Sequence, residues 1–157
     1  MNKKFLVIGN PIEHSLSPKL HNYWIKKNDL KASYDKKLLV ESEIQQLISN
    51  VREEKIHGLN VTVPFKKIVI PFLDILSHEA KNSQSVNIIY KDKDKIIGDN
   101  TDIEGFKIAL EATSQVIKNK KVLILGAGGV VPSIIIALKK MQVAKICLSN
   151  RTKSNAL

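Results

Sequence analysis

Several polar side chains between residues 10 and 105 could do chemistry together. A lysine and a carboxylate, Lys66 and Asp102, can exchange a proton with a carbonyl or alcohol group if they share one pocket. Neutral hydroxyls and amides that could hold a hydroxylated acid accompany them: Ser15, Ser17, Asn60, Thr62 and Asn87. Each residue alone has an ordinary structural use as a cap, a turn or a solvated surface group. Their joint occurrence predicts one substrate pocket, with Lys66 and Asp102 as its catalytic pair.

These polar residues follow short apolar runs that predict buried strands. Residues 5–8, 34–40, 58–63 and 85–90 read as strands. Amphipathic stretches between them predict a helix over 41–54, a helix beyond Pro71 within residues 68–81, and one beginning near Pro18, with Ser17 as its N-cap. In an open α/β sheet, residues just beyond the carboxyl ends of the strands converge on one crevice. The polar residues therefore lie where a ligand would bind.

A second kind of signal follows at residues 122–141, where an apolar strand, a glycine-rich turn and an apolar helix succeed one another. Such a turn brings the backbone close to a pyrophosphate at a helix N-terminus. The turn that could cradle it comprises Gly126, Ala127, Gly128, Gly129 and Val130. The strict glycine pattern fails at its third position, which is Val131.

The next predicted strand, 145–149, ends in residues suited to a phosphate. Arg151 stands between Asn150 and Thr152, where a dinucleotide fold that prefers NAD often carries a carboxylate. A guanidinium pairs well with phosphate oxygens, which favours NADP(H). Lys153 and Asn155 follow in the same segment.

The predicted fold class is α/β, with two parts. Residues 1–102 form a mostly parallel open-sheet substrate domain, and residues 103–157 begin a Rossmann-type dinucleotide-binding domain. Because such a fold has about six strands and only two can be read here, we expect the chain to be a fragment, inactive alone.

Composition excludes several other classes. The formal net charge is +10, but only Arg52 and Arg151 of the 25 basic residues are arginines, and the lysines are spread along the chain. The sequence contains no basic block with interleaved aromatics, which is the pattern that would indicate nucleic-acid binding. No apolar run approaches the roughly 20 residues of a membrane span. The single Cys147 lies in an apolar run, which predicts a buried thiol and a cytoplasmic protein. The four histidines show no metal-ligand spacing.

Taken in order, the motifs resemble those of the shikimate dehydrogenase family. They read G-N-P-I-E-H-S-L-S-P-K-L-H-N, N-V-T-V-P-F-K, G-D-N-T-D-I-E-G, G-A-G-G and N-R-T. The resemblance implies NADPH-dependent reduction of 3-dehydroshikimate to shikimate in chorismate biosynthesis, by an enzyme that is a monomer or homodimer when complete. It implies that Ser15 and Ser17 bind the substrate carboxylate and that Lys66 is the acid/base group. It implies further that residues 150–155 hold the adenosine 2′-phosphate.

Two alternatives stay open. One is a quinate/shikimate dehydrogenase that uses NAD, which Arg151 disfavours. The other is a non-catalytic relative that senses a pathway intermediate. The presence of both Lys66 and Asp102 argues against a sensor, because binding alone needs no acid/base pair.

Overall fold

The computed structural model describes residues 2–152. The chain divides into two compact units, Met1–Asp99 (unit 1) and Asn100–Leu157 (unit 2), which are described separately. The division lies close to the boundary predicted after residue 102. The function of each part stays a prediction.

Unit 1 is built on one six-stranded sheet with the order β2-β1-β3-β5-β6-β4. β1 pairs in parallel with β2 and β3, β4 pairs in parallel with β6, and β5 is antiparallel to β3 and β6. The strands are β1 (Lys3–Gly9), β2 (Ala32–Leu38), β3 (Gly58–Val61), β4 (Ile75–Leu76), β5 (Ile88–Asp92) and β6 (Lys95–Asp99). The predicted α/β class with a mostly parallel sheet is thus confirmed.

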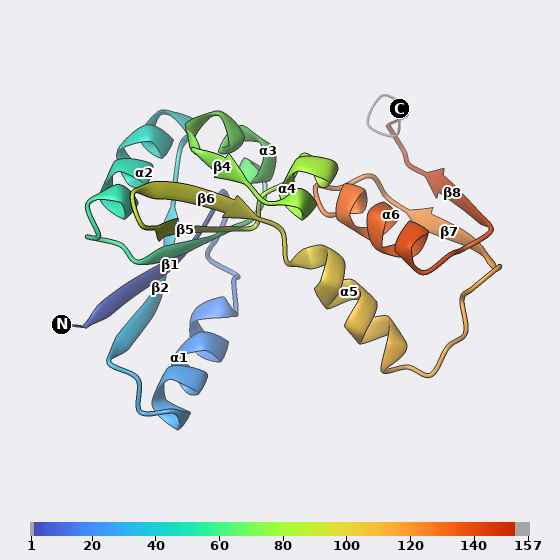
Figure 1. Cartoon of the computed structure of the whole chain (residues 1–157), viewed down its shortest axis with the longest axis horizontal. Coiled ribbons are helices and arrows are strands. Elements are labelled where there is room, and N and C mark those ends of the chain that lie inside the picture. Colours follow the sequence, from blue (N-terminus) through green and yellow to red (C-terminus); the bar gives the residue numbers. More distant parts are fainter. Residues whose placement is uncertain (1, 153–157) are drawn as a thin grey trace. The chain divides into compact units, whose positions relative to one another are not determined.

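Helices lie on both faces of this sheet (Figure 1). α2 (Ile44–Arg52) buries four apolar side chains at helical spacing, Ile44, Leu47, Ile48 and Val51, and they join the main core. α1 (Ser17–Lys27) lies on the opposite face. The remaining helical elements are η1 (Glu41–Glu43), α3 (Phe65–Ile68), η2 (Ile70–Phe72) and α4 (His78–Ser83).

Two local predictions were wrong. The helix expected beyond Pro71 within 68–81 begins only at His78, as α4, because Pro71 sits in a short 3-10 turn and the chain then pairs with β6 before Ser77 caps α4. The N-cap of α1 is Leu16, not Ser17, and makes no side-chain capping bond. Pro18 still occupies the first turn, where its missing N–H costs nothing.

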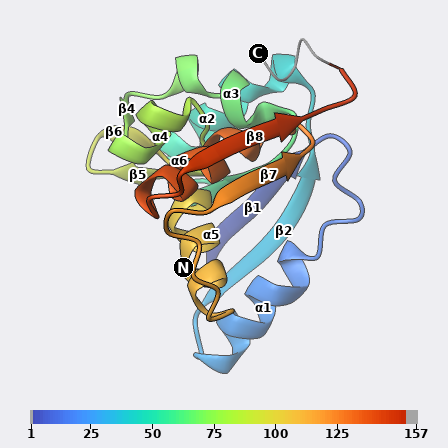
Figure 2. The same cartoon turned by 90° about the vertical axis from the view of Figure 1, so that its right-hand side faces the viewer.

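Unit 2 holds the predicted strand–turn–helix–strand succession. Its elements are α5 (Asp102–Glu111), β7 (Lys121–Leu125), α6 (Val131–Lys140) and β8 (Lys145–Ser149). β7 and β8 pair in parallel, and α6 lies on one face of the pair (Figure 2). On the other face Leu123 is 61% and Leu125 79% exposed. The prediction of a buried Cys147 was wrong, because alternation along β8 turns its side chain toward that exposed face.

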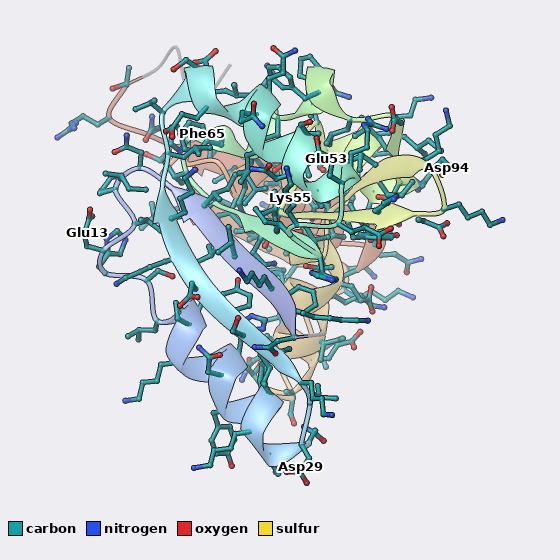
Figure 3. All side chains as sticks on the ribbon, turned by 90° about the vertical axis from the view of Figure 1, so that its left-hand side faces the viewer. Glu13, Asp29, Glu53, Lys55, Phe65 and Asp94 are labelled. Carbon is teal, nitrogen blue, oxygen red and sulfur yellow. The ribbon has the colours of Figure 1, made fainter. Side chains whose placement is uncertain are left out.

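Several charged side chains stand at the ends of elements and in loops. Figure 3 shows Glu13 in the loop after β1, Asp29 just beyond α1 and Asp94 at the β5–β6 turn. Glu53 and Lys55 form an exposed ion pair of 2.6 Å after α2. No helix among the described residues is long and apolar enough to cross a membrane.

Candidate functional site

One edge of the unit 1 sheet brings three of the predicted site residues close together in the backbone. Val61 is the last residue of β3, and its N–H donates to the carbonyl oxygen of Asn87 at 2.9 Å. The N–H of Val86 donates to the carbonyl oxygen of Lys66 at 2.8 Å. Thr62 directly follows β3, so Thr62, Lys66 and Asn87 lie where β3 ends and its antiparallel partner β5 begins.

Ser15 and Ser17 follow the neighbouring strand, β1, at the same edge. A Cβ atom on Gly9, the last residue of β1, would stand 2.7 Å from the Thr62 side chain, so only glycine lets the two segments approach this closely. Beyond Gly9, the hydroxyl of Ser15 accepts the backbone N–H of Ser17 at 3.3 Å. The parallel pairing of β1 and β3 therefore sets Gly9 beside Thr62, and the segment that carries the two serines begins there.

A tyrosine that the sequence reasoning missed holds Asn60. Tyr34 is only 4% exposed, and its hydroxyl donates to Asn60 Oδ1 at 2.6 Å. Asn60 Nδ2 in turn donates to the carbonyl oxygen of Asn87 at 3.3 Å. The Tyr34 ring stacks on the His21 imidazole, with centroids 4.1 Å apart and planes 5° from parallel. Burial raises the pKa of Tyr34 and lowers that of His21, so both favour their neutral forms.

Asp102 belongs to unit 2 and is the first residue of α5. Its backbone N–H donates to Asn100 Oδ1 at 3.0 Å, and the N–H of Ile103 donates to the same oxygen at 3.3 Å. Asn100, which is 3% exposed, thus accepts hydrogen bonds from two backbone N–H groups that have no partner within the first turn of α5. Thr101 is the N-cap residue of α5, but its side chain makes no capping bond. The pairing of Lys66 with Asp102 stays a prediction.

The glycine turn of unit 2 combines one positive φ with open space around two of its glycines. Gly126 has φ +101°, a conformation that side chains with a Cβ avoid. A Cβ atom on Gly128 or Gly129 would meet no atom within 4 Å, so packing within the chain does not require glycine there. Open space of this kind beside a helix N-terminus is what the close approach of a pyrophosphate would require.

Pairing of β7 with β8 brings the second predicted cofactor segment beside this turn. The N–H of Gly126 donates to the carbonyl oxygen of Ser149 at 2.8 Å, so residues 150–152 leave β8 next to the glycines. Asn150 Nδ2 donates to the carbonyl oxygen of Thr152 at 2.8 Å and shapes that loop. Arg151 is exposed. Lys153 and Asn155 lie outside the described residues.

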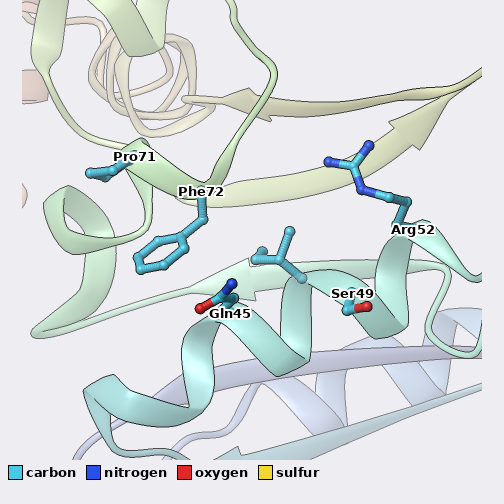
Figure 4. Close-up of a pocket in the computed structure, with 6 residues that line it drawn as sticks. Gln45, Ser49, Arg52, Pro71 and Phe72 are labelled. Carbon is cyan, nitrogen blue, oxygen red and sulfur yellow. The ribbon is translucent and has the colours of Figure 1, made fainter.

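A separate pocket of about 380 Å³ contains none of the predicted site residues (Figure 4). It lies between α2 and η2 and is lined by Gln45, Ile48, Ser49, Arg52, Pro71 and Phe72. The Arg52 guanidinium is already paired with Asp74 at 2.9 Å, and this partner lowers the pKa of the Asp74 carboxyl. Among residues 2–152, no group of three or more His, Cys, Asp or Glu side chains is arranged to hold a metal ion.

Comparison with known proteins gives consistent matches. The family model described as the shikimate dehydrogenase substrate binding domain matches residues 7–89, which is more than half of the chain. The shikimate dehydrogenase (NADP(+)) of Pelagibacter ubique is 72% identical over all 157 residues, and these cover 59% of that protein.

Solved structures agree with the sequence matches. The shikimate dehydrogenase of Aquifex aeolicus has a TM-score of 0.91 at 38% identity, covering 99% of this chain and 58% of that one. The Thermus thermophilus enzyme, solved in complex with NADP(H) and shikimate, has a TM-score of 0.88 at 32% identity, covering 98% of this chain and 58% of that one. The chain spans somewhat more than half the length of these relatives. By the family model and these likenesses, the chain belongs to the shikimate dehydrogenase family.

Proposed function

We propose that this chain is the substrate-binding part and the beginning of the cofactor-binding part of an enzyme that reduces 3-dehydroshikimate to shikimate with NADPH. Residues 1–102 would form the substrate domain and residues 103–157 would begin the NADP-binding domain. The observation that carries the proposal is the match of residues 7–89 to the family's substrate-binding domain, because this range contains the polar edge with Ser15, Ser17, Thr62, Lys66 and Asn87.

Each residue of that edge suits one part of the substrate. Ser15 and Ser17 offer hydroxyl donors to the substrate carboxylate, and Thr62 and Asn87 offer a hydroxyl and an amide to the ring hydroxyls. When bound, NADPH supplies a hydride to the carbonyl carbon. Lys66 would give the matching proton to the carbonyl oxygen, and Asp102 would share the hydrogen bond at that oxygen.

The cofactor would be held by the turn Gly126, Ala127, Gly128, Gly129 and Val130 and by the loop after β8. The open space at Gly128 and Gly129 supports the first contact, and the exposed Arg151 beside the turn supports recognition of a 2′-phosphate. Asn150, Thr152, Lys153 and Asn155 belong to the same proposed segment. The partners would be small molecules alone, in a cytoplasmic enzyme that is a monomer or a homodimer.

The decisive test is NADPH-linked reduction of 3-dehydroshikimate by the full-length enzyme, or by this chain joined to the C-terminal segment of the Pelagibacter ubique relative. Lys66→Ala should lower kcat about 10²–10⁴-fold, the usual effect of a positioned acid/base group. Lys67→Ala, one residue on and exposed, is the matched control and should keep the wild-type rate. Binding of shikimate without turnover would favour the sensor, and equal use of NADH would favour the NAD-dependent alternative.

A further inference from the structure

We infer that Asn100 and Ser133 are positioning residues, which together hold the start of α5, where Asp102 lies, against the helix that follows the glycine turn. The inference rests on the proposed function, since it gives these two residues a role in the same reaction. Asn100 and Ser133 stand 33 residues apart in the sequence, and both lie within unit 2.

The bond that joins them is buried. Asn100 Nδ2 donates to Ser133 Oγ at 2.9 Å, and the two residues are 3% and 0% exposed. Asn100 Oδ1 accepts the backbone N–H groups of Asp102 and Ile103. These two donors fix which side of the amide is oxygen, so Nδ2 must face Ser133. One side chain therefore contacts both helices.

Ser133 is an unusual residue for its place. It is the third residue of α6, in a helix whose other buried residues are Val131, Ala137 and Leu138. A hydroxyl in such surroundings is costly unless it is hydrogen-bonded, and Asn100 supplies that bond. α5 and α6 pack against each other in this region.

The two helix starts joined in this way carry the groups that the proposed reaction needs at a fixed distance from each other. The start of α6 carries the turn proposed to hold the pyrophosphate, and the start of α5 carries Asp102, proposed to act at the reacting oxygen. Hydride transfer depends on reacting atoms held about 3–3.5 Å apart, and a displacement of about 1 Å can cost about a hundredfold in rate. A buried bridge between the two helix starts limits such displacement.

The test uses the full-length enzyme with Ser133→Ala, which deletes only the accepting oxygen, and Asn100→Ala, which deletes the whole bridge. We expect kcat to fall about tenfold to a hundredfold in Ser133→Ala and further in Asn100→Ala. KM for 3-dehydroshikimate and Kd for NADPH should stay within about twofold. The control is Thr113→Val, which removes a hydroxyl bond of 2.7 Å to Leu110 just past the other end of α5 and should leave kcat unchanged.

A readout independent of turnover is amide hydrogen exchange at Asp102 and Ile103, whose N–H groups are bonded to Asn100. Their exchange should quicken about tenfold or more in Ser133→Ala, at a temperature well below the unfolding midpoint. Unchanged amide exchange at Asp102 and Ile103 in Ser133→Ala would overturn the inference. So would a Ser133→Ala enzyme that keeps the wild-type kcat and shows only a lowered thermal unfolding midpoint. A wild-type enzyme without NADPH-linked activity would overturn the proposed function, and with it any catalytic role of the bridge.

Discussion

Replacing Tyr34 by Phe should weaken unit 1 by an amount that depends on pH in a specific way. The change deletes the hydroxyl that donates to Asn60 Oδ1 at 2.6 Å and leaves the ring to stack on His21. A hydrogen bond of this kind contributes about 0.5–1.5 kcal/mol net. Because Asn60 is half-buried and water can partly replace the lost donor, we expect a loss of about 1 kcal/mol in the free energy of unfolding at pH 7.

The sign of the pH dependence follows from the raised pKa of Tyr34. Above about pH 10 the unfolded chain ionises this tyrosine while the folded chain keeps it protonated, so folding stability falls as pH rises. The loss approaches about 1.4 kcal/mol per pH unit for this single group. Tyr34→Phe has no hydroxyl to ionise at this position and so does not lose this stability as pH rises. The curves of unfolding free energy against pH for the two proteins should therefore cross between about pH 10 and pH 11.

The assay is urea unfolding of the chain at a series of pH values, followed by the fluorescence of Trp24, the only tryptophan among its 157 residues. Trp24 is a suitable probe because its ring lies 5.4 Å from that of His21, the stacking partner of Tyr34. Lysine deprotonation affects both proteins and cancels in the comparison. Tyr23→Phe, 60% exposed on the same helix as Trp24, is the control and should behave as wild type. Parallel curves for wild type and Tyr34→Phe up to about pH 11 would refute the reasoning.

Three further predictions concern unit 2. Arg151→Ala should weaken NADPH binding to the full-length enzyme by about 1.5–3 kcal/mol and leave NADH nearly unaffected, as measured by fluorescence titration; equal losses would exclude phosphate recognition. Gly126→Ala should lower the thermal unfolding midpoint, because the φ of Gly126 is +101°. Gly128→Ala, with open space around the added methyl group, should weaken NADPH binding without changing the midpoint. The reverse pattern would contradict the turn's proposed role. Residues 1–157 alone should show no dehydrogenase activity, and robust turnover by the chain alone would refute this. Amide protons after Thr113 should exchange faster than those of residues 2–99, because β7 and β8 have one exposed face.

The parts of the site that the sequence predicted well are those that depend on local backbone geometry. Polar residues after an apolar strand must lie beyond its end, and Thr62 and Lys66 do follow β3 as this rule requires. The roles of Ser15, Ser17, Thr62 and Lys66 in binding stay predictions. The glycine turn was predicted for the same kind of reason, since the positive φ of Gly126 is a local requirement.

The wrong predictions concern features that depend on neighbouring elements rather than on the local sequence. Residues 68–81 have apolar residues at helical spacing, yet two of them, Ile75 and Leu76, pair with β6. A strand pair this short has little intrinsic preference and forms because a partner strand is present. Cys147 was expected to be buried because its segment is apolar, but burial requires a covering layer, and α6 covers only one face of β7 and β8.

The positioning residues were missed for a different reason. Tyr34 occupies an ordinary strand position and Ser133 an ordinary helix position, and their partners Asn60 and Asn100 lie 26 and 33 residues away. No periodicity links residues so far apart, because each contact is created when two separately predictable elements pack. In both pairs an asparagine amide is oriented by a buried hydroxyl, and the same amide then bonds to the backbone at or beside a proposed site residue, Asn87 or Asp102. Residues proposed to bind a ligand could therefore be named from local patterns, whereas those that hydrogen-bond beside them become visible only when the fold brings their partners together.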